Sequence, residues 1–414
     1  MLLDLKTLWK IKRFRILLTA RTLSNIGNGM SPIAMAFGVL SLPGSNASSL
    51  SWVTASHMVP LVLFMLLGGV VDDRMGRARV VGVTDSIGAF VVATSGVLFL
   101  TAQATVPLLC VNAFVFGILN AMWWPAFAGL LPEVVPSENL QAANSLVGLG
   151  ANVGFTLGAT MGAGIVSTVG PGWAIIGDGF TFFIAGILVL QLRLPTKMQT
   201  GEIEKHPAMI SQLRQGWTEF SSRKWIVVIV ICFAFINMCF EGFLGVLAPV
   251  QMKEAMGGAR DLGLMLFAFG AGNIGGVLVS LRVKPKHPLI VAMGGMPIVG
   301  VWMIGAAVPF HIVILMILAF VSGIAMDLFF VMWMTMFQTH VPEEALSRVS
   351  AYDALGSTVF APLGLFLAGP ISLWIGTSET LYIAGVIAIV MAGAALFNKD
   401  VRRLEPVTEL VNVD

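Results

Sequence analysis

The sequence Gly69-Val70-Val71-Asp72-Asp73-Arg74-Met75-Gly76-Arg77-Ala78-Arg79 separates two long apolar runs. Five of the eight residues at 72–79 are charged, whereas only 11% of the whole chain is charged. A charged side chain at the centre of a membrane helix costs about 2.5–3.5 kcal/mol on insertion scales, so this stretch cannot lie in hydrocarbon. We therefore predict that residues 69–79 form a short charged loop at a membrane surface.

The composition is that of an integral membrane protein. Hydrophobic residues make up 57% of the chain and the mean hydropathy is +0.89, whereas soluble domains carry roughly 25% charged residues. The formal net charge of +2 is too small to indicate a nucleic-acid partner. Cys110, Cys232 and Cys239 lie inside apolar runs, which favours a role in packing over a disulfide framework.

The sequence does not indicate an enzyme. It contains no nucleophile–base pair, metal-ligand cluster or phosphate-binding loop. The run Gly270-Ala271-Gly272-Asn273-Ile274-Gly275 matches a dinucleotide fingerprint, but it lies in an apolar run and no strand precedes it. We therefore expect no enzymatic activity, no cofactor and no bound metal.

Hydropathy predicts an all-α membrane protein. A spanning helix requires about 20 mostly apolar residues. This rule predicts twelve spans: 16–40, 50–71, 80–102, 106–131, 140–168, 172–194, 225–250, 262–281, 288–308, 311–337, 349–375 and 379–398.

The connections between the spans are short except for one polar, proline-containing stretch. We therefore predict an N-terminal six-helix bundle (1–194), a cytoplasmic linker (195–224), a C-terminal six-helix bundle (225–398) and a cytoplasmic tail (399–414).

Most of the 24 Lys and Arg residues gather on one side of this topology, as the positive-inside rule requires of cytoplasmic loops. The loops on the opposite side hold only Lys253 and Arg260, and Arg21 lies inside the first span. We therefore expect both termini to be cytoplasmic.

The two halves of the chain resemble each other. Gly68-Gly69-Val70-Val71 has a counterpart in Gly275-Gly276-Val277-Leu278 at an offset of 207, and basic residues follow both. Val135-Pro136-Ser137-Glu138 recurs as Val341-Pro342-Glu343-Glu344 at an offset of 206. Because six predicted spans separate the copies, the two halves form parallel repeats about an axis normal to the membrane.

The opening stretch resembles the loop between the second and third helices of the major facilitator superfamily of secondary transporters. Gly69, Asp73, Arg74, Gly76 and Arg77 occupy the family positions. The resemblance implies two pseudo-symmetric six-helix bundles that alternate access, with this loop as a conformational latch. It also implies a multi-pass protein of the bacterial cytoplasmic membrane. The alternative is a basic loop that serves topology alone.

A glycine recurs every fourth residue in the fifth span, which permits close helix approach. The resemblance implies that this stripe faces the eighth span, which has glycines at the same spacing, and that both pack between the halves. The residues concerned are Gly150, Gly154, Gly158, Gly162, Gly272 and Gly276. Residues 154–163 also follow the exporter motif of drug antiporters, with Ala159 in place of its proline and Ala163 in place of its last glycine.

Ionisable residues inside predicted spans are the sharpest functional signal, because they normally face a cavity or a partner. Arg21 and Asp85 lie near the cytoplasmic ends of their spans, and we expect them to pair. Glu241, Asp327 and Asp178 are the candidates for proton coupling, because a buried carboxyl group can exchange a proton near neutral pH. The resemblance places Glu241 and Asp327 beside the cavity and gives Asp178 a more structural position. The alternative is that these acids are static anchors.

The resemblance also implies a substrate cavity among the first, fourth, seventh and tenth spans. Aromatic, methionine and amide side chains there would suit a bulky amphipathic molecule. The alternative is that most of them pack between helices. The candidates are Asn25, Asn28, Met30, Asn112, Asn120, Trp123, Trp124, Phe240, Met326, Trp333 and Met334.

Residues 23–30 and 348–353 resemble the branch that holds macrolide efflux proteins and the enterobactin exporter. The function expected is proton-coupled antiport of a hydrophobic or amphipathic small molecule, such as a drug, antibiotic or siderophore-like metabolite, by a monomer in the lipid bilayer. An importer or facilitator, and a lysolipid translocase, remain alternatives because they share the fold.

Overall fold

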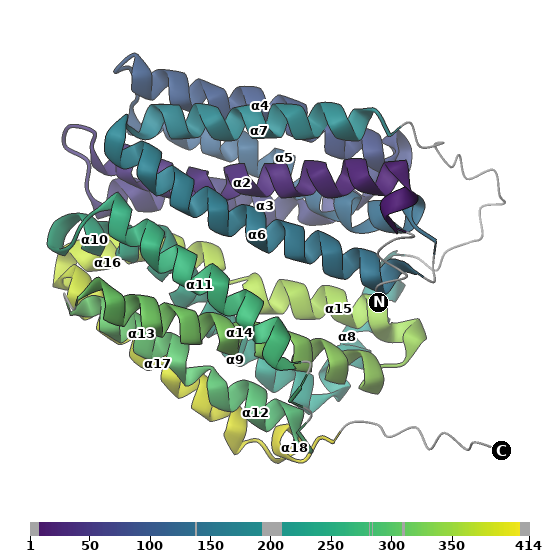
Figure 1. Ribbon diagram of the computed structural model, residues 1–414. Helices are drawn as coiled ribbons and strands as arrows, with labels where there is room; N and C mark the ends of the chain where they lie inside the picture. The colour runs from purple at the N-terminus through teal and green to yellow at the C-terminus, as the bar shows by residue number, and fades with distance from the viewer. Residues whose placement is uncertain are drawn as a thin grey trace, which may run out of the picture. The chain divides into compact units, whose positions relative to one another are not determined.

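The computed structural model describes residues 8–136, 139–192, 209–280, 282–283, 285–308 and 311–405. In these ranges the chain forms helices joined by short turns, and no strand occurs (Figure 1). The first half contains α2 (Lys12–Leu40), α3 (Ala47–Met75), α4 (Arg77–Leu100), α5 (Val106–Val134), α6 (Leu140–Thr168) and α7 (Pro171–Leu190). The second half contains α8 (Met209–Ser222), α9 (Lys224–Gly242), η2 (Phe243–Leu247), α10 (Ala248–Ala255), α11 (Ala259–Ser280), α12 (Pro288–Gly295), α13 (Pro297–Ala307), α14 (Ile312–His340), α15 (Glu343–Thr358), α16 (Ala361–Ile375), α17 (Thr377–Phe397) and α18 (Lys399–Arg402).

Eleven helical segments of the described chain are long and apolar enough to cross a membrane. The remaining predicted span is α2, whose 29 residues extend about 43 Å at ~1.5 Å per residue and so exceed a hydrocarbon core of roughly 30 Å. Its polar residues, such as Asn25 and Asn28, lower its hydropathy. The predicted all-helical membrane fold is confirmed.

The charged stretch at 69–79 is not a loop. Helix α3 continues to Met75 and α4 begins at Arg77, so Gly76 alone joins the two helices. Gly76 has φ of +84°, a left-handed conformation that favours glycine. A helix can continue through charged residues once it has left the hydrocarbon, which explains why the predicted loop was wrong. The side chains of residues 66–74, which include Gly69, Asp73 and Arg74, lie outside the described part of the structure.

Three of the predicted spans are interrupted helices, and one of them, 349–375, divides into α15 and α16. The span predicted at 225–250 consists of α9, the π-helical η2 and α10. Pro249 is the second residue of α10 and has no N–H to donate to the preceding turn, so the wider π turn accommodates it. Pro297 likewise starts α13 immediately after α12.

The contacts between residues divide the chain into two compact units. Unit 1 contains Met1–Thr200, Leu244–Gly270 and Leu365–Thr377, and unit 2 contains Gly201–Phe243, Ala271–Gly364 and Ser378–Asp414. The domain boundaries proposed from the sequence at 194 and 225 stay a prediction, and residues 193–208 of the predicted linker lie outside the described residues.

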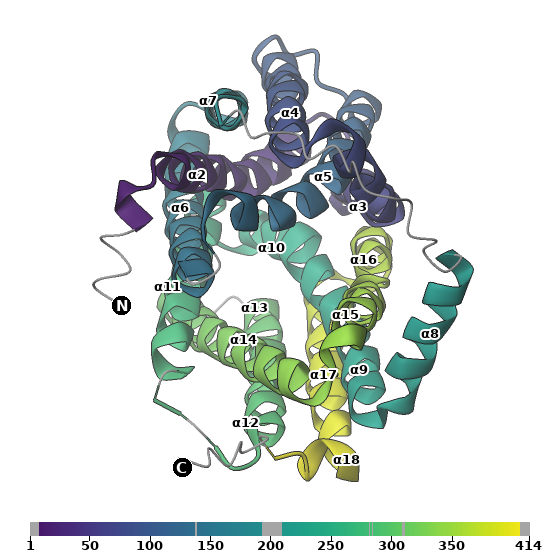
Figure 2. The same cartoon turned by 90° about the vertical axis from the view of Figure 1, so that its right-hand side faces the viewer.

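Unit 1 is built from closely packed helix pairs. Helix α4 lies beside α7 (Figure 1), and α2 lies beside both α6 and α7 (Figure 2). At one end of these helices, Phe14, Leu17, Val80, Leu130 and Ala143 are fully or almost fully buried in one apolar cluster.

The glycine stripe of α6 packs against α2, not against the eighth span. A Cβ atom at Gly150, Gly154, Gly158 or Gly162 would meet atoms of α2, such as Met30 Cα at 2.7 Å from the position at Gly162. Gly272 and Gly276 of α11 pack against α14 instead. The spacing of the glycines therefore indicated close helix packing. Helix α6 also meets α11, but through other residues: Ala163 lies against Gly263, and Thr156 lies against Gly270.

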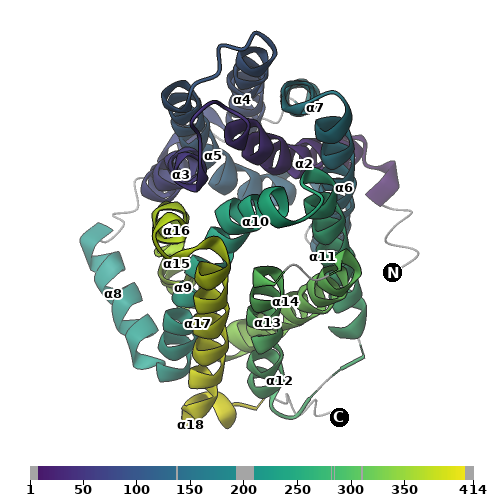
Figure 3. The same ribbon diagram turned by 90° about the vertical axis from the view of Figure 1, so that its left-hand side faces the viewer.

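Unit 2 brings α12, α13 and α14 together, and α17 lies beside α13 (Figure 3). Gly300 of α13 and Gly385 of α17 face each other, and a Cβ at Gly300 would lie 2.6 Å from Ile389 Cγ1. Helix α8, which the sequence analysis did not predict, packs against α15 through the rings of Trp217 and Phe220, which contact Tyr352.

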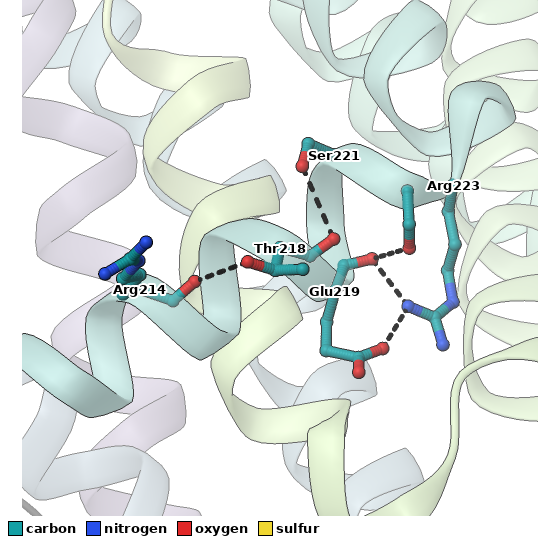
Figure 4. Close-up of polar contacts among 6 residues, drawn as sticks. Arg214, Thr218, Glu219, Ser221 and Arg223 are labelled. Carbon is teal, nitrogen blue, oxygen red and sulfur yellow. Dashed lines mark hydrogen bonds and ion pairs between the residues drawn. The ribbon is translucent and has the colours of Figure 1, made fainter.

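The end of α8 is held by a local hydrogen-bond network (Figure 4). Arg223 Nη1 donates to the carbonyl oxygen of Glu219 at 2.5 Å and to its Oε2 atom at 2.7 Å. Thr218 Oγ1 donates to the Arg214 carbonyl at 3.0 Å. A basic side chain at a helix C-terminus satisfies carbonyls that have no partner in the helix, and here it fixes the turn from α8 into α9.

Candidate functional site

Arg21 of α2 lies in a cage of aromatic rings from α5. Its guanidinium carbon is 4.7 Å from the ring centre of Trp123, 4.9 Å from that of Phe127 and 5.8 Å from that of Trp124. Trp123 and Phe127 stack on each other with ring centres 4.6 Å apart. A cation over aromatic faces gains about 0.5–2 kcal/mol, more when it is shielded from water. The cage therefore holds a positive charge inside unit 1.

Asp85 of α4 completes this cluster. Its side chain is 5% exposed, and it interacts electrostatically with the Arg21 guanidinium. The Trp123 indole also lies beside the carboxyl group. The Arg21 guanidinium is therefore the cationic neighbour of this buried carboxyl group.

The two asparagines of α5 face neighbouring helices. Asn112 Nδ2 donates to Ser95 Oγ of α4 at 3.1 Å. Asn120 Nδ2 lies 3.1 Å from Nε2 of His57 in α3, and the His57 ring stacks on Phe116. The sequence analysis did not single out His57, although an ionisable residue in the middle of a span is itself a signal.

Asp178 of α7 packs against the backbone of α2. A Cβ atom at Gly27 would collide with Asp178 Oδ1 and Thr181 Oγ1 and would lie 3.1 Å from Asp178 Cγ. Asp178 is 1% exposed, and the Ser31 hydroxyl hydrogen-bonds to its carboxyl group. Among the described residues, no donor reaches Oδ1.

In unit 2, Asp353 of α15 joins α14 through hydrogen bonds. Trp333 Nε1 donates to Asp353 Oδ2 at 3.2 Å, and Ser357 Oγ donates to Asp353 Oδ1 at 3.3 Å. Asn237 Nδ2 of α9 donates to the Ser357 carbonyl at 2.8 Å. These hydrogen bonds together connect α9, α14 and α15. The sequence analysis named Asp353 only as part of a motif.

Aromatic rings extend this network along α9 and α14. Phe329 stacks on Phe233 with ring centres 4.1 Å apart, and Trp333 lies 6.2 Å from Phe329 and 5.4 Å from Trp225. The offset of 206 residues that relates Val135 to Val341 also relates the Trp123–Phe127 stack of α5 to the Phe329–Trp333 stack of α14.

The two acids proposed for coupling in the second half have different surroundings. Asp327 of α14 packs against α11, where a Cβ at Gly276 would lie 2.7 Å from Asp327 Cβ, and no donor among the described residues reaches its buried Oδ2. Glu241 is half-buried and lies in the last turn of α9, immediately before the π-helical η2. π turns within helices frequently occur at functional sites.

The remaining residues proposed to line the substrate cavity differ in how exposed their side chains are. Asn25 and Met30 are buried in contacts of α2 with α6 and α7, and Asn25 Nδ2 donates to the Arg21 carbonyl at 2.7 Å. Phe240 is also buried and contacts Trp302. Trp124 is 48% exposed. Asn28, Met326 and Met334 are half-buried.

Arg77 anchors the start of α4 to α5. Its Nη1 donates to the Gly129 carbonyl and to Glu133 Oε1, both at 3.0 Å. The residue proposed as part of a latch is thus bonded within unit 1 in this structure.

At the opposite end of unit 1, later segments meet the first helices. Gly369 N donates to Ser51 Oγ at 2.8 Å, and Phe366 packs edge-on against Trp52 with ring centres 4.9 Å apart. Lys253 of α10 donates to the carbonyl oxygen of Leu40 at the end of α2. These contacts bring helices of both sequence halves together within one unit.

A bundle of many membrane-spanning helices with charged and amide groups at the helix contacts is typical of membrane transport proteins. Residues 17–352 match the model of the Major Facilitator Superfamily, and the chain belongs to this family of secondary transporters. It is therefore a transporter and not an enzyme.

Curated relatives cover most of the chain at low identity. The multidrug efflux pump Tap of Mycolicibacterium fortuitum is 26% identical over 413 residues, which is 94% of this chain and 96% of the relative. Tap of Mycobacterium bovis strain BCG is 25% identical over 91% of each chain. An uncharacterised transporter of this type from Bacillus subtilis, YkuC, is 26% identical over 67% of each chain.

Solved structures show the same fold. The nucleoside transporter NupG has a TM-score of 0.71 at 15% identity and is matched over 99% of its chain and 93% of this one. A bacterial homologue of the lysosomal transporter Spinster has a TM-score of 0.67 at 14% identity, with 94% of this chain and 96% of that chain covered. Identities this low support the fold alone.

Proposed function

We propose that the chain is a secondary active exporter of hydrophobic or amphipathic small molecules, driven by proton antiport through alternating access. The observation that carries this proposal is the near full-length similarity to proteins named multidrug efflux pumps. The family establishes transport, whereas direction, driving ion and substrate belong to the proposal.

The aromatic stacks on α5 and α14 support an amphipathic substrate. Each stack has a carboxyl group beside it, Asp85 in unit 1 and Asp353 in unit 2. Trp124 adds a partly exposed ring at the α5 stack. Aromatic rings suit hydrophobic and amphipathic molecules, because such molecules bind mainly through contact area. The resemblance of residues 23–30 to the macrolide efflux and enterobactin exporter branch agrees with this substrate class.

Glu241 and Asp327 are the proposed proton carriers of the second half, and Asp178 is the candidate in the first. The Gly69–Arg77 segment is the proposed latch. We further propose that the protein acts as a monomer in the cytoplasmic membrane of a bacterium, with both termini in the cytoplasm.

The test is export by the full chain in inside-out membrane vesicles. Ethidium should accumulate in the vesicles when their interior is acidic, and a protonophore should abolish accumulation. Ethidium accumulation that is the same with and without the proton gradient would disprove proton coupling. Ethidium movement only out of these vesicles would indicate an importer. Flipping of fluorescent lysolipid in proteoliposomes without ethidium transport would instead support a translocase.

Substitutions distinguish the acids proposed to carry the coupling proton from acids that do not carry it. Glu241→Gln and Asp327→Asn should each reduce gradient-driven accumulation while leaving ethidium exchange down its own gradient intact, because each removes one proton site and little volume. The matched control is Glu133→Gln, which changes an acid on the half-exposed end of α5. If both variants drive export normally, these two carboxylates are not the carriers.

A further inference from the structure

Among the described side chains, unit 1 buries two acids in membrane helices, Asp85 and Asp178, and Asp85 alone of these two has a cationic neighbour. Asp85 is 5% exposed and lies beside Arg21. Asp178 is 1% exposed, and the groups around it are neutral: Gly27 and Ser31 of α2 and Thr181 of its own helix. The two acids therefore differ in what balances a negative charge.

The donors around Asp178 do not suffice for a carboxylate. Thr181 Oγ1 donates to the backbone carbonyl of Asp178 at 2.8 Å and so does not serve the carboxyl group. Ser31 supplies one hydroxyl. Asp178 Oδ1 is buried and meets no donor among the described residues. If the carboxyl group were ionised, this oxygen would have neither water nor a hydrogen-bond donor. It would then bear the full free-energy cost of desolvation.

No charged group on the packed helices faces Asp178 closely enough to offset that cost. Helix α6 has no charged residue, and Asp178 is the only one in α7. The charged residues of α2 are Lys12, Arg13, Arg15 and Arg21, those of α4 are Arg77, Arg79 and Asp85, and α5 has Glu133. Arg21, the nearest of these to Gly27 along α2, is six residues away and is caged against α5.

We propose that Asp178 is a proton-binding site of unit 1 and that the contact of α7 with Gly27 of α2 is its gate. This inference rests on the proposed function, because it assigns the coupling proton to a specific carboxyl group. In the arrangement seen here Asp178 holds the proton as a neutral carboxylic acid. Release requires α2 to move away from α7 so that water reaches the oxygen.

Gly27 makes this gate possible because it has no side chain. Asp178 Oδ1 and Thr181 Oγ1 both occupy the place that a Cβ atom at Gly27 would take. An alanine there must push α2 away from α7 or displace the carboxyl group, so it opens the route for water. Gly164 of α6 supplies the matched control, since a Cβ at that position meets nothing within 4 Å.

Infrared spectroscopy of the full chain in nanodiscs tests whether Asp178 carries a proton, and it requires no substrate. The wild type should show the carbonyl stretch of protonated carboxylic acid near neutral pH. Asp178→Asn should lose one component of that band, and Asp85→Asn should keep that component. In D2O the band should shift slowly in the wild type and in Gly164→Ala, and faster in Gly27→Ala. A spectrum that Asp178→Asn leaves unchanged overturns the proposal, as does exchange equally fast in wild type and Gly27→Ala. If Gly27→Ala does not fold, the Asp178→Asn spectrum still decides.

Transport assays then distinguish a failure of the Asp178 proposal from a failure of the proposed function. In inside-out vesicles, Asp178→Asn should abolish ethidium accumulation driven by a pH gradient and preserve ethidium exchange at equal pH, because only coupling needs the proton. Preserved accumulation in Asp178→Asn overturns the role in coupling. A wild type without proton-driven transport refutes proton-driven export, whereas the infrared band would still establish Asp178 as a proton site.

Discussion

The guanidinium carbon of Arg21 in α2 lies 4.7 Å from the ring centre of Trp123 in α5. The contact joins two helices that are far apart in sequence and leaves the positive charge beside Asp85 of α4. A charge that would be costly in hydrocarbon is thus retained by aromatic faces and one carboxylate.

Replacing Arg21 should therefore destabilise the protein strongly. Arg21→Gln leaves Asp85 buried without its counter-charge, and breaking one side of a buried pair costs about 3–5 kcal/mol. The measurement is thermal unfolding of the purified protein in detergent. Arg21→Gln combined with Asp85→Asn should recover part of the loss, because the orphaned charge is gone. Unfolding of Arg21→Gln at the wild-type temperature would show that the pair does not stabilise unit 1.

The glycines of α6 should not tolerate alanine where they meet α2. At Gly158 the added Cβ would lie 2.7 Å from the backbone carbon of Ile26, so Gly158→Ala must separate the helices. Gly164→Ala in the same helix meets nothing within 4 Å, and it should be neutral or stabilising by up to about 1 kcal/mol because alanine favours helix. Size-exclusion profiles and melting temperatures of both variants provide the comparison. Equal behaviour of the two would contradict the close packing of α2 and α6.

These glycines show what could and could not be read from the sequence. Hydropathy located the spans because each must cover the same hydrocarbon thickness, and the predicted ends of 140–168 agree with α6. The four-residue spacing indicated close approach but not the partner, since any helix can enter such a groove. The tertiary fold, not the local pattern, selects α2.

Side-chain networks were the least predictable part. The resemblance made Asn120 a candidate for the cavity lining, but it did not predict that the Asn120 amide meets His57 of α3. The local sequence of α5 does not indicate which residue of another span contacts Asn120. Helix α8 was predictable in principle, because apolar residues recur at 210, 213, 217 and 220 with helical spacing. Its polar composition led instead to the prediction of a linker.

Trp333 should contribute to stability through its hydrogen bond to Asp353. Trp333→Phe keeps an aromatic ring against Phe329 but removes the Nε1 donor, which leaves Asp353 Oδ2 without that partner. Leaving a buried polar group unsatisfied costs about 1–3 kcal/mol. Chemical denaturation of the full chain measures the difference. Trp374→Phe is the control, because Trp374 is 85% exposed. An equal effect of both substitutions would argue against the hydrogen bond.

Arg77 should matter less for stability than its two hydrogen bonds suggest. Its side chain is 39% exposed and that of Glu133 is 30% exposed, so solvent screens the pair. Exposed ion pairs contribute about 0–1 kcal/mol, and Glu133→Gln should change the melting temperature little. If Arg77→Gln abolishes transport while the protein stays folded, the residue acts in conformational change, as proposed for the latch. Unimpaired transport by Arg77→Gln would remove it from that role.

The contact of Gly369 with Ser51 should control access to one end of unit 1. A Cβ at Gly369 would lie 2.5 Å from Ser51 Oγ, and the Gly369 N–H is bonded to that same oxygen. Gly369→Val should therefore separate residues 365–377 from α3.

The predicted topology puts this end outside the cell, where a cysteine at Ala55, now 4% exposed, would become accessible. In a background without Cys110, Cys232 and Cys239, a membrane-impermeant maleimide should label Ala55→Cys about 10-fold faster when Gly369→Val is added, a change of ~1.4 kcal/mol in the opening equilibrium. Gly393→Val is the control, since a Cβ there meets nothing within 4 Å. Equal labelling with and without Gly369→Val in a folded protein would show that this contact does not close the outer end.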